Sequence, residues 1–247
     1  MPVNVINAFS KDTPYIAKWY DDKDGAISLR FDDSLDSHVN TVIPLLNKYN
    51  LKATFMVNPG LKRYQQNKDF WETNVPAMGH RLGNHTMHHS GARTLKEADY
   101  EIGAASKIIW ALYPKESKLQ VFASGGGEKW GGEYWENASD EYKKLVSKYY
   151  LIDLYDGNHP SMGAHSKTSS EKLCNLINQA IEKREHQAFT FHNIGNPGII
   201  DYLKALKNGR NLTVAASEFT NYLNCIDEMR NRIWISPLIQ ILKYENE

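Results

Sequence analysis

Three groups of residues in this sequence have side chains that can bind a metal ion or move a proton. They are an adjacent pair of carboxylates, a pair of histidines four residues apart, and a single histidine after an apolar run: Asp32 and Asp33, His85 and His89, and His192. Two histidines with one carboxylate suit zinc and leave a fourth position open for water, which is the pattern of a catalytic rather than a closed structural site. The sequence therefore indicates metal-assisted chemistry.

Each group also has an ordinary structural interpretation. The two carboxylates follow a predicted strand and equally suit the N-terminal cap of the next helix. The spacing of His85 and His89 puts two imidazoles on one face of a helical turn, but His85 and His88 are also a feasible pair. His192 can be a core histidine that hydrogen-bonds a backbone carbonyl, although its ordinary pKa near neutrality also suits a general acid.

Short apolar segments alternate with amphipathic segments along the chain. Strands are predicted near residues 26–31, 52–57, 80–85, 119–123, 149–154, 188–191 and 232–236, and helices near 39–49, 67–78, 95–112, 138–148, 169–185 and on both sides of 211–214. Thr94 and Glu97 form a capping box before helix 95–112. Strands that alternate with helices imply βαβ units and a parallel sheet. We expect an α/β protein in which about seven parallel strands form a closed or nearly closed barrel.

The reactive residues lie where such a barrel concentrates chemistry, at the carboxyl ends of its strands. Asp32 and Asp33 follow strand 26–31, His85 ends strand 80–85, and His192 follows strand 188–191. We therefore expect side chains from three strand ends to meet at one end of the barrel.

Composition limits the possible partners. The 247 residues carry 29 basic and 29 acidic side chains, and this zero net charge lacks the basic excess of a nucleic-acid binder. The apolar runs are far shorter than the ~18 residues of a transmembrane segment, and the first residues do not form a signal peptide. We expect a cytoplasmic protein, or an exported one whose leader has been removed. Cys174 and Cys225 are interpreted as two buried thiols, with one disulfide as the alternative. The sequence does not indicate an oligomeric state.

In their order and context the three groups resemble the motifs of the polysaccharide deacetylases, the NodB-homology group also called carbohydrate esterase family four. Residues 31–33, Phe-Asp-Asp, match the first motif, and residues 85–89, His-Thr-Met-His-His, match the second. Residues 190–192, Thr-Phe-His, match the last motif loosely. The likeness covers most of residues 26–244. We therefore divide the chain into an irregular N-terminal segment, 1–25, and a single deacetylase barrel, 26–247.

The resemblance implies a distorted (β/α) barrel that holds one divalent metal ion, usually zinc. It implies that Asp33, His85 and His89 are the metal ligands, that Asp32 is the base and that His192 is the acid. In this mechanism the metal polarises an acetyl carbonyl and lowers the pKa of a water molecule that Asp32 deprotonates. His192 then protonates the leaving amine or alcohol. The implied substrate is an acetylated oligo- or polysaccharide.

The sequence departs from the family pattern at two motifs. The third motif normally presents an arginine that orients the base, but here strand 119–123 runs into Ser124 and three glycines. Three other arginines are candidates for this role: Arg30, Arg81 and Arg93. The fourth motif, an aspartate, has no clean match. Two carboxylates are candidates to support His192: Asp153 and Asp156.

We expect a metal-dependent hydrolase that removes N- or O-linked acetyl groups from a carbohydrate. Trp130, in the glycine-rich segment, is a candidate to stack on a sugar ring. One alternative is a catalytically weakened, carbohydrate-binding member of the fold, which the missing arginine suggests. Another is an amidase that acts on a small amide. Members of that branch tend to lack the histidine pair, so the presence of the pair argues against it.

Overall fold

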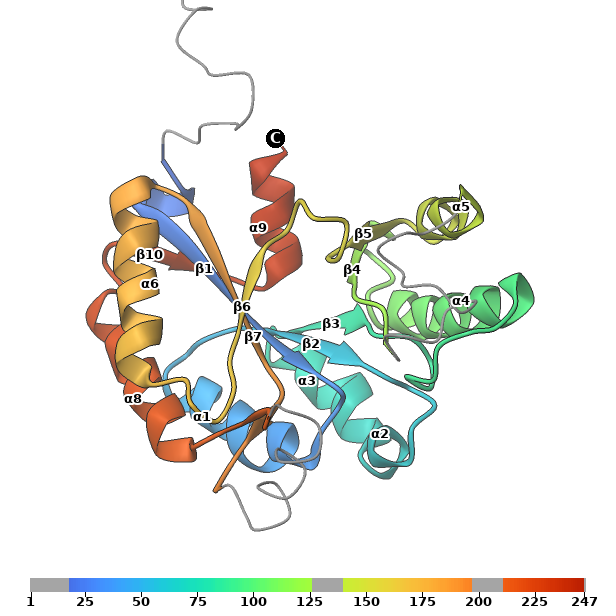
Figure 1. Cartoon of the computed structure of the whole chain (residues 1–247), viewed down its shortest axis with the longest axis horizontal. Coiled ribbons are helices and arrows are strands. Elements are labelled where there is room, and N and C mark those ends of the chain that lie inside the picture. The colour runs from blue at the N-terminus through green and yellow to red at the C-terminus, as the bar shows by residue number, and fades with distance from the viewer. Residues whose placement is uncertain (1–17, 126–139, 197–210, 247) are drawn as a thin grey trace, which may run out of the picture.

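The structure is a computed structural model that describes residues 18–125, 140–196 and 211–246. Within these ranges the chain is an α/β protein whose main sheet is parallel and curls into a half-barrel (Figure 1). Seven strands follow the order β5-β4-β3-β2-β1-β7-β6, and an eighth, β10, also pairs with β1. Their bounds are Gly25–Asp32 (β1), Thr54–Val57 (β2), Arg81–Asn84 (β3), Gln120–Phe122 (β4), Leu151–Asp153 (β5), Ser161–Gly163 (β6), His186–Phe191 (β7) and Ile233–Ile235 (β10). The expected distorted barrel of about seven parallel strands is confirmed.

The long strand β1 lies at the centre of the sheet because three strands pair with it. β7 pairs with most of its length, β10 pairs with its first residues, and β2 pairs with its last ones. The carboxyl end of β1 is therefore flanked by β2 and β7, and residues that follow Asp32 emerge in the middle of the barrel end.

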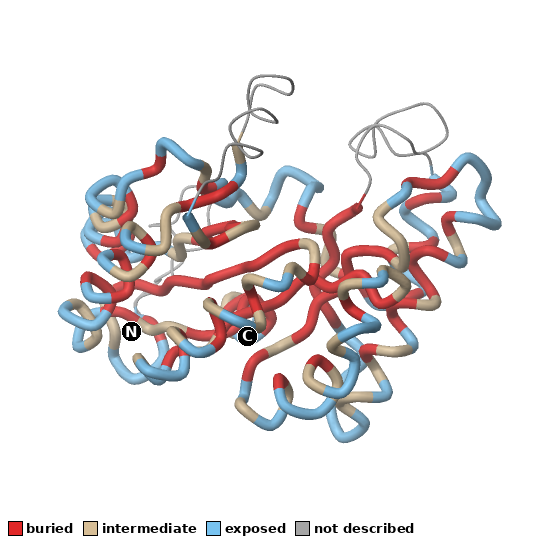
Figure 2. The backbone as a smooth tube through the Cα atoms, turned by 90° about the horizontal axis from the view of Figure 1, so that it is seen from below, coloured by how far each residue is buried: buried red, intermediate tan, exposed pale blue. Residues whose placement is uncertain are grey.

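Most helices cover the outer face of the sheet, and their solvent-facing sides are exposed, as are several loops (Figure 2). The helical elements have these bounds: Tyr20–Asp22 (η1), His38–Val42 (η2), Ile43–Lys48 (α1), Lys62–Gln66 (α2), Phe70–Asn74 (η3), Val75–Ala77 (α3), Leu95–Leu112 (α4), Asp140–Lys148 (α5), Ser170–Lys183 (α6), Ala216–Glu228 (α8) and Leu238–Glu245 (α9). The predicted capping box is present, since Thr94 accepts from the backbone of Glu97 and Glu97 accepts from the backbone of Thr94.

The two faces of the sheet pack against different partners because strand side chains alternate in direction. On the outer face, the ring of Phe31 stacks between those of Phe55 and Phe191, with ring centroids 5.3 and 5.4 Å away. On the inner face, Met56 of β2 and Val121 of β4 belong to a buried cluster with Leu238, Ile239 and Leu242 of α9. Helix α9 therefore fills the concave side of the half-barrel.

Some elements differ from the expectation. β6, on the edge of the sheet, and a two-stranded sheet of β8 (Asn193–Ile194) and β9 (Thr213–Val214) are short strands that no alternating pattern marks. The predicted helix 39–49 is a π-helical turn, η2, followed by α1, with Pro44 at the first turn of α1. Proline has no N–H to donate into the preceding turn, so it occupies a helix start. The helix expected before residue 211 lies outside the described residues.

Cys174 of α6 and Cys225 of α8 form a disulfide, with their Cα atoms 6.1 Å apart. The interpretation of two buried thiols is therefore wrong, because the packing of α6 against α8 brings the two cysteines within disulfide range. Among the described residues, no helix is both long enough and apolar enough to span a bilayer.

Candidate metal centre

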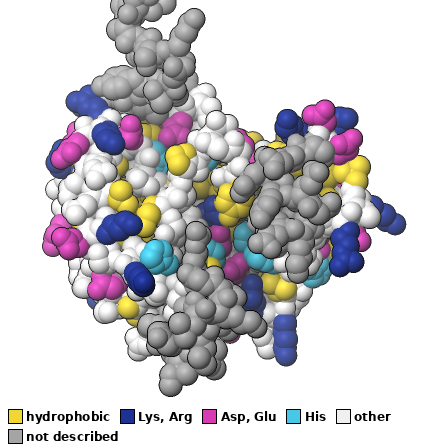
Figure 3. Space-filling model, viewed as in Figure 1, with side chains coloured by type: hydrophobic (Ala, Val, Ile, Leu, Met, Phe, Trp, Pro, Cys, Tyr) yellow, Lys and Arg dark blue, Asp and Glu magenta, His cyan; other side chains and the backbone are white. Residues whose placement is uncertain are grey.

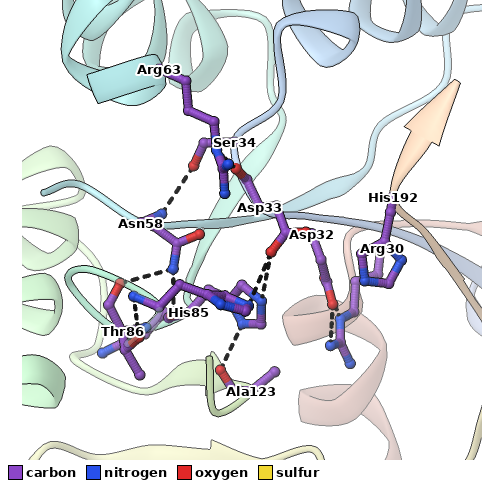
Figure 4. Close-up of polar contacts among 12 residues, drawn as sticks. Arg30, Asp32, Asp33, Ser34, Asn58, Arg63, His85, Thr86, Ala123 and His192 are labelled. Carbon is purple, nitrogen blue, oxygen red and sulfur yellow. Dashed lines mark hydrogen bonds and ion pairs between the residues drawn. The ribbon is translucent and has the colours of Figure 1, made fainter. Parts of the chain in front are cut away.

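The carboxylate of Asp33 meets the imidazoles of His85 and His89 at the carboxyl end of the sheet (Figure 4). Asp33 Oδ1 lies 3.3 Å from His85 Nε2 and 3.2 Å from His89 Nε2. Although this oxygen is buried, it accepts no hydrogen bond from any described residue. Burial alone would raise the pKa of Asp33, but its close contacts with the imidazoles of His85 and His89 and the charges of His85 and His192 lower that pKa far below its usual range.

This arrangement fits a zinc ion in both chemistry and spacing. A tetrahedral zinc ion at about 2.0–2.1 Å from each ligand holds its ligand atoms roughly 3.3–3.4 Å apart. The two separations measured from Asp33 Oδ1 match that spacing. His85 also hydrogen-bonds the carbonyl of Ala123 through Nδ1, at 2.8 Å. Nδ1 is then the protonated nitrogen, and the lone pair of Nε2 faces the cluster, as a ligating histidine requires.

A loop, rather than the expected helical turn, brings the two histidines together. Thr86 and His89 both have left-handed backbone conformations, with φ of 68° and 57°. Thr86 N–H donates to Asn84 Oδ1 at 2.8 Å, and His89 N–H donates to Thr86 Oγ1 at 3.2 Å. Asn58 also donates its side-chain amide to the carbonyls of His85 and Thr86. These hydrogen bonds hold the loop in a shape that folds His89 back over His85.

The two adjacent carboxylates point in different directions. Asp33 and Ser34 have φ of 84° and 51°, so the chain turns sharply as soon as β1 ends. Asp33 reaches the histidine pair, whereas Asp32 keeps the direction of the inward side chains of β1. Neither carboxylate caps η2, whose N-cap residue is Ser37. The sharp turn lets neighbouring residues face two different partners.

Arg30 holds Asp32 with two hydrogen bonds. Arg30 Nε lies 2.7 Å from Asp32 Oδ1, and a terminal nitrogen lies 2.5 Å from Oδ2. Both side chains are almost fully buried, at 4% and 1% exposure. Burial acts to raise the pKa of Asp32, but the charges of Arg30 and His85 and the hydrogen bonds from Arg30 lower it overall. Asp32 is thus a fixed, ionised carboxylate beside the cluster.

His192 follows β7 on the other side of Asp32, and its charge also helps to lower the pKa of Asp32. Its backbone carbonyl accepts a hydrogen bond from His38 Nε2 at 2.8 Å. His38 is fully buried, and burial lowers its pKa to about 4, so it donates as a neutral imidazole. The ring atom Nδ1 of His192 is buried and has no hydrogen-bond partner among the described residues.

His88 faces away from the cluster and pairs with Glu101 of α4. Its Nδ1 lies 2.7 Å from Glu101 Oε1, and its backbone N–H donates to Oε2 at 2.8 Å. The backbone carbonyl of Glu101 also accepts from Met87 N–H at 2.9 Å. One buried residue thus fixes two consecutive positions of the histidine loop. The pair that shares the cluster is His85 with His89, not His85 with His88.

Replacing Glu101 with alanine is expected to lower zinc affinity about 10-fold, because outer partners that orient a metal site typically contribute about 10- to 100-fold. Titration of the metal-free protein against a chromogenic zinc chelator measures this change. Asp99→Ala is the matched control, since Asp99 is a carboxylate on the same helix that contacts Lys148 and Tyr149 instead. Wild-type zinc affinity in the Glu101 variant would show that the loop keeps its shape without this carboxylate.

The space-filling view places histidine and acidic side chains in a hollow between the two halves of the molecule (Figure 3).

A family model described as polysaccharide deacetylase matches residues 20–149, more than half of the chain. The chain belongs to the polysaccharide deacetylase family. The match includes the strand that carries Asp32 and Asp33 and the loop that carries both histidines of the cluster.

Solved structures of deacetylases share this fold at low sequence identity. A polysaccharide deacetylase from Bacillus cereus has a TM-score of 0.53 and 16% identity, covering 86% of this chain and 91% of that one. The catalytic domain of a peptidoglycan N-acetylglucosamine deacetylase from Eubacterium rectale has a TM-score of 0.52 and 16% identity, covering 87% and 88%. A family 4 carbohydrate esterase from Streptomyces lividans in complex with acetate has a TM-score of 0.50 and 14% identity, covering 88% and 94%.

A curated relative of much greater length is more similar in sequence. A gellan lyase from Bacillus sp is 38% identical over 252 residues, which cover 94% of this chain and 10% of the relative. The chain therefore spans about a tenth of the length of the curated relative that it matches.

The third motif of the polysaccharide deacetylases lacks its arginine here, but an arginine on β1 contacts Asp32. Among the three candidates, Arg30 alone contacts Asp32 in the described residues. Arg81 pairs with Glu116 at the opposite end of β3, and Arg93 is exposed. A buried arginine two residues before an aspartate is the signal for this pair, because residues i and i+2 of a strand share a face.

The two candidates for the aspartate of the fourth motif have other partners. Asp153 accepts from the hydroxyl of Tyr142 and from the backbone N–H of Tyr155, and Asp156 accepts from Asn158. Neither aspartate hydrogen-bonds His192 in the described part of the chain. Trp130 lies outside the described residues.

Glu101 and Asn58 position the histidine loop, but neither was predicted from the sequence to belong to the site. Glu101 had a recognisable signal, since it interrupts the apolar face of helix α4 among Ala98, Ile102 and Ala105. A charged residue on a buried helix face needs a specific partner. Asn58 had no comparable signal, because asparagine before proline and glycine is also an ordinary turn residue.

Proposed function

We propose that the protein is a metal-dependent deacetylase that hydrolyses acetyl groups on a carbohydrate, and that residues 26–247 form its catalytic unit. The cluster of Asp33, His85 and His89 beside an arginine-held Asp32 carries this proposal. The family membership supports the substrate class, an acetylated oligo- or polysaccharide. Zinc is the proposed ion because two imidazoles and one carboxylate are its usual catalytic ligands.

Each residue near the cluster has a distinct proposed role. Asp33, His85 and His89 would hold the ion, which when bound polarises a carbonyl and makes water more acidic. Asp32, kept ionised by Arg30, accepts a proton from the attacking water. His192 donates a proton to the leaving nitrogen or oxygen, and the hydrogen bond from His38 to its carbonyl fixes the position of its backbone.

The Arg30–Asp32 pair weakens the case for a catalytically inactive carbohydrate-binding protein. That alternative depended on the missing arginine of the third motif, and Arg30 supplies the same contact from another place. An amidase remains a chemical alternative, since the same groups can attack a different carbonyl.

Acetate release from acetylated glycans tests the proposal. The full chain, stripped of metal and then reloaded with one equivalent of zinc, is expected to release acetate from at least one member of a panel of N- and O-acetylated oligosaccharides. The stripped protein is expected to be inactive. Equal activity with and without metal would contradict the mechanism, and binding of an oligosaccharide with no acetate released from any of them would favour the binding protein.

Replacing His192 with alanine is expected to slow turnover about 10²- to 10⁴-fold while the protein still binds one zinc ion, because general-acid catalysis is typically worth that factor. Turnover of the zinc-loaded variant and its zinc content measure the two effects separately. Asp32→Asn is expected to behave in the same way, with zinc retained and activity lost. Loss of zinc in the His192 variant would make this histidine part of the metal site instead.

A further inference from the structure

We propose that Arg63 recognises a carboxylate on the acetylated sugar, so that the preferred substrate is an acidic glycan such as one containing a uronic acid. This inference rests on the proposed deacetylase function. It concerns which acetylated sugar the site selects. It follows from an arginine that lies beside the cluster of Asp33, His85 and His89 and forms no ion pair with a described carboxylate.

Arg63 extends from α2 toward the turn that follows β1 (Figure 4). Its Nε–H donates a hydrogen bond to the backbone carbonyl of Asp33, the carboxylate residue of the cluster. The contact with Asp33 raises the pKa of His89 overall, and the positive charge of Arg63 acts against that rise. Arg63 is therefore close to both Asp33 and His89, although its guanidinium forms no ion pair with the carboxylate of Asp33.

The hydrogen bond through Nε leaves the terminal nitrogens of Arg63 unused. No described residue accepts a hydrogen bond from them, and no described carboxylate forms an ion pair with this side chain. Because Nε anchors the guanidinium, its orientation is fixed before a substrate arrives. A planar guanidinium with two free nitrogens fits a carboxylate in a two-point contact.

The charge of the site also favours an anionic substrate. Arg30 and Asp32 neutralise each other, and Glu101 lies against His88, away from the cluster. Asp33 carries one negative charge, which a divalent ion more than offsets. Arg63 then adds a positive charge that no described acidic side chain balances. A neutral acetylated sugar leaves this excess positive charge unbalanced, whereas a sugar carboxylate within reach of Arg63 balances it.

A purely structural role for Arg63 makes a different prediction. If Arg63 only positions Asp33 through the backbone carbonyl, its removal should weaken zinc binding and slow the reaction with every substrate. If it recognises a carboxylate, its removal should slow the reaction of substrates that carry one much more than that of substrates without one. The two roles are therefore separated by comparing matched substrates and by measuring zinc affinity.

The matched substrates are an acetylated oligosaccharide that contains glucuronic acid and the same compound with its carboxyl group reduced to an alcohol. For the wild type, kcat/KM is expected to be about 10- to 100-fold higher for the acidic form, since a hydrogen bond to a charged group is worth about that factor. Arg63→Met is expected to lose this preference, because kcat/KM falls about 10- to 100-fold more on the acidic form than on the reduced form. Lys62→Met, which removes the exposed cation next in sequence, is the control and should keep the preference.

Two results would overturn the inference while leaving the deacetylase proposal intact. One is a wild-type enzyme that is active on both forms but does not prefer the acidic one. The other is an Arg63 variant whose rate falls equally on both forms as its zinc affinity falls, which assigns Arg63 to positioning Asp33. If no compound in the panel releases acetate with the zinc-loaded wild type, the deacetylase proposal itself fails, and the inference fails with it.

Discussion

Replacing His85 with alanine is expected to lower zinc affinity more than about 100-fold and to abolish acetate release. The expected loss exceeds the roughly 10- to 100-fold effect of an outer partner, because this side chain supplies a ligand atom itself. His85 is also the better fixed of the two histidines, since it is almost fully buried and anchored to the carbonyl of Ala123. Zinc content after dialysis, and competition with a chromogenic chelator, measure the affinity.

His88→Ala is the matched control for this experiment. It removes an imidazole from the same loop, but one whose ring hydrogen-bonds Glu101. This variant is expected to bind one zinc ion with at most a moderate loss of affinity, while His89→Ala should resemble His85→Ala. If the His88 variant lost zinc and the His89 variant kept it, the ligand pair would be the other one that the sequence allows.

Replacing Arg30 with methionine is expected to have the largest effect on stability, a loss of about 3–5 kcal/mol in the free energy of unfolding at neutral pH. This is the usual cost of removing one partner from a buried ion pair, since the other charge is left unpaired. Asp32 is 1% exposed, so water cannot replace the arginine. Urea unfolding followed by circular dichroism measures the change.

The same substitution should also change the pH dependence of the reaction. Arg30 lowers the pKa of Asp32, so removing Arg30 raises that pKa and leaves Asp32 protonated at higher pH. The acidic limb of the pH–rate profile is therefore expected to move toward neutral pH. The stability lost with Arg30 is expected to return as pH falls through the raised pKa, because the protonated carboxyl no longer carries an unpaired charge.

Two further variants make the result specific. Arg93→Met removes an exposed arginine and should leave stability within about 0.5 kcal/mol of the wild type, as surface substitutions usually do. The double variant Arg30→Met with Asp32→Leu removes both buried charges and should recover most of the stability while remaining inactive. An Arg30 variant as stable as the wild type, with an unchanged pH profile, would show that Asp32 does not depend on Arg30.

The sequence was sufficient to predict the barrel and the strand ends that carry the reactive side chains. Alternating apolar segments and the capping box at Thr94 are local features, and they specify elements such as β1 and α4 without tertiary information. The carboxyl ends of parallel strands then share one edge, so Asp33 and His85 could be expected to lie near each other.

The shape of the histidine loop and the partners of Asp32 could not be predicted in the same way. The loop contains two residues with left-handed conformations, Thr86 and His89, and the carbonyls of His85 and Thr86 accept hydrogen bonds from Asn58, which is distant in sequence. The sequence alone left three arginines as candidates to contact Asp32. The three-dimensional arrangement shows that Arg30 makes this contact. Likewise, the disulfide depends on how α6 and α8 pack.

The position of Arg30 on β1 has a consequence for how this site can diversify in evolution. In a polysaccharide deacetylase whose third motif contains the arginine, the segment after the fourth strand must retain that arginine. Here Asp32 and Arg30 share one strand, and the segment after β4 contacts the histidine loop through the carbonyl of Ala123, which accepts a hydrogen bond from His85. Any amino acid supplies a carbonyl. The segment that follows Phe122 need not supply an arginine, so natural variation at that requirement can leave the proposed base and its partner in place.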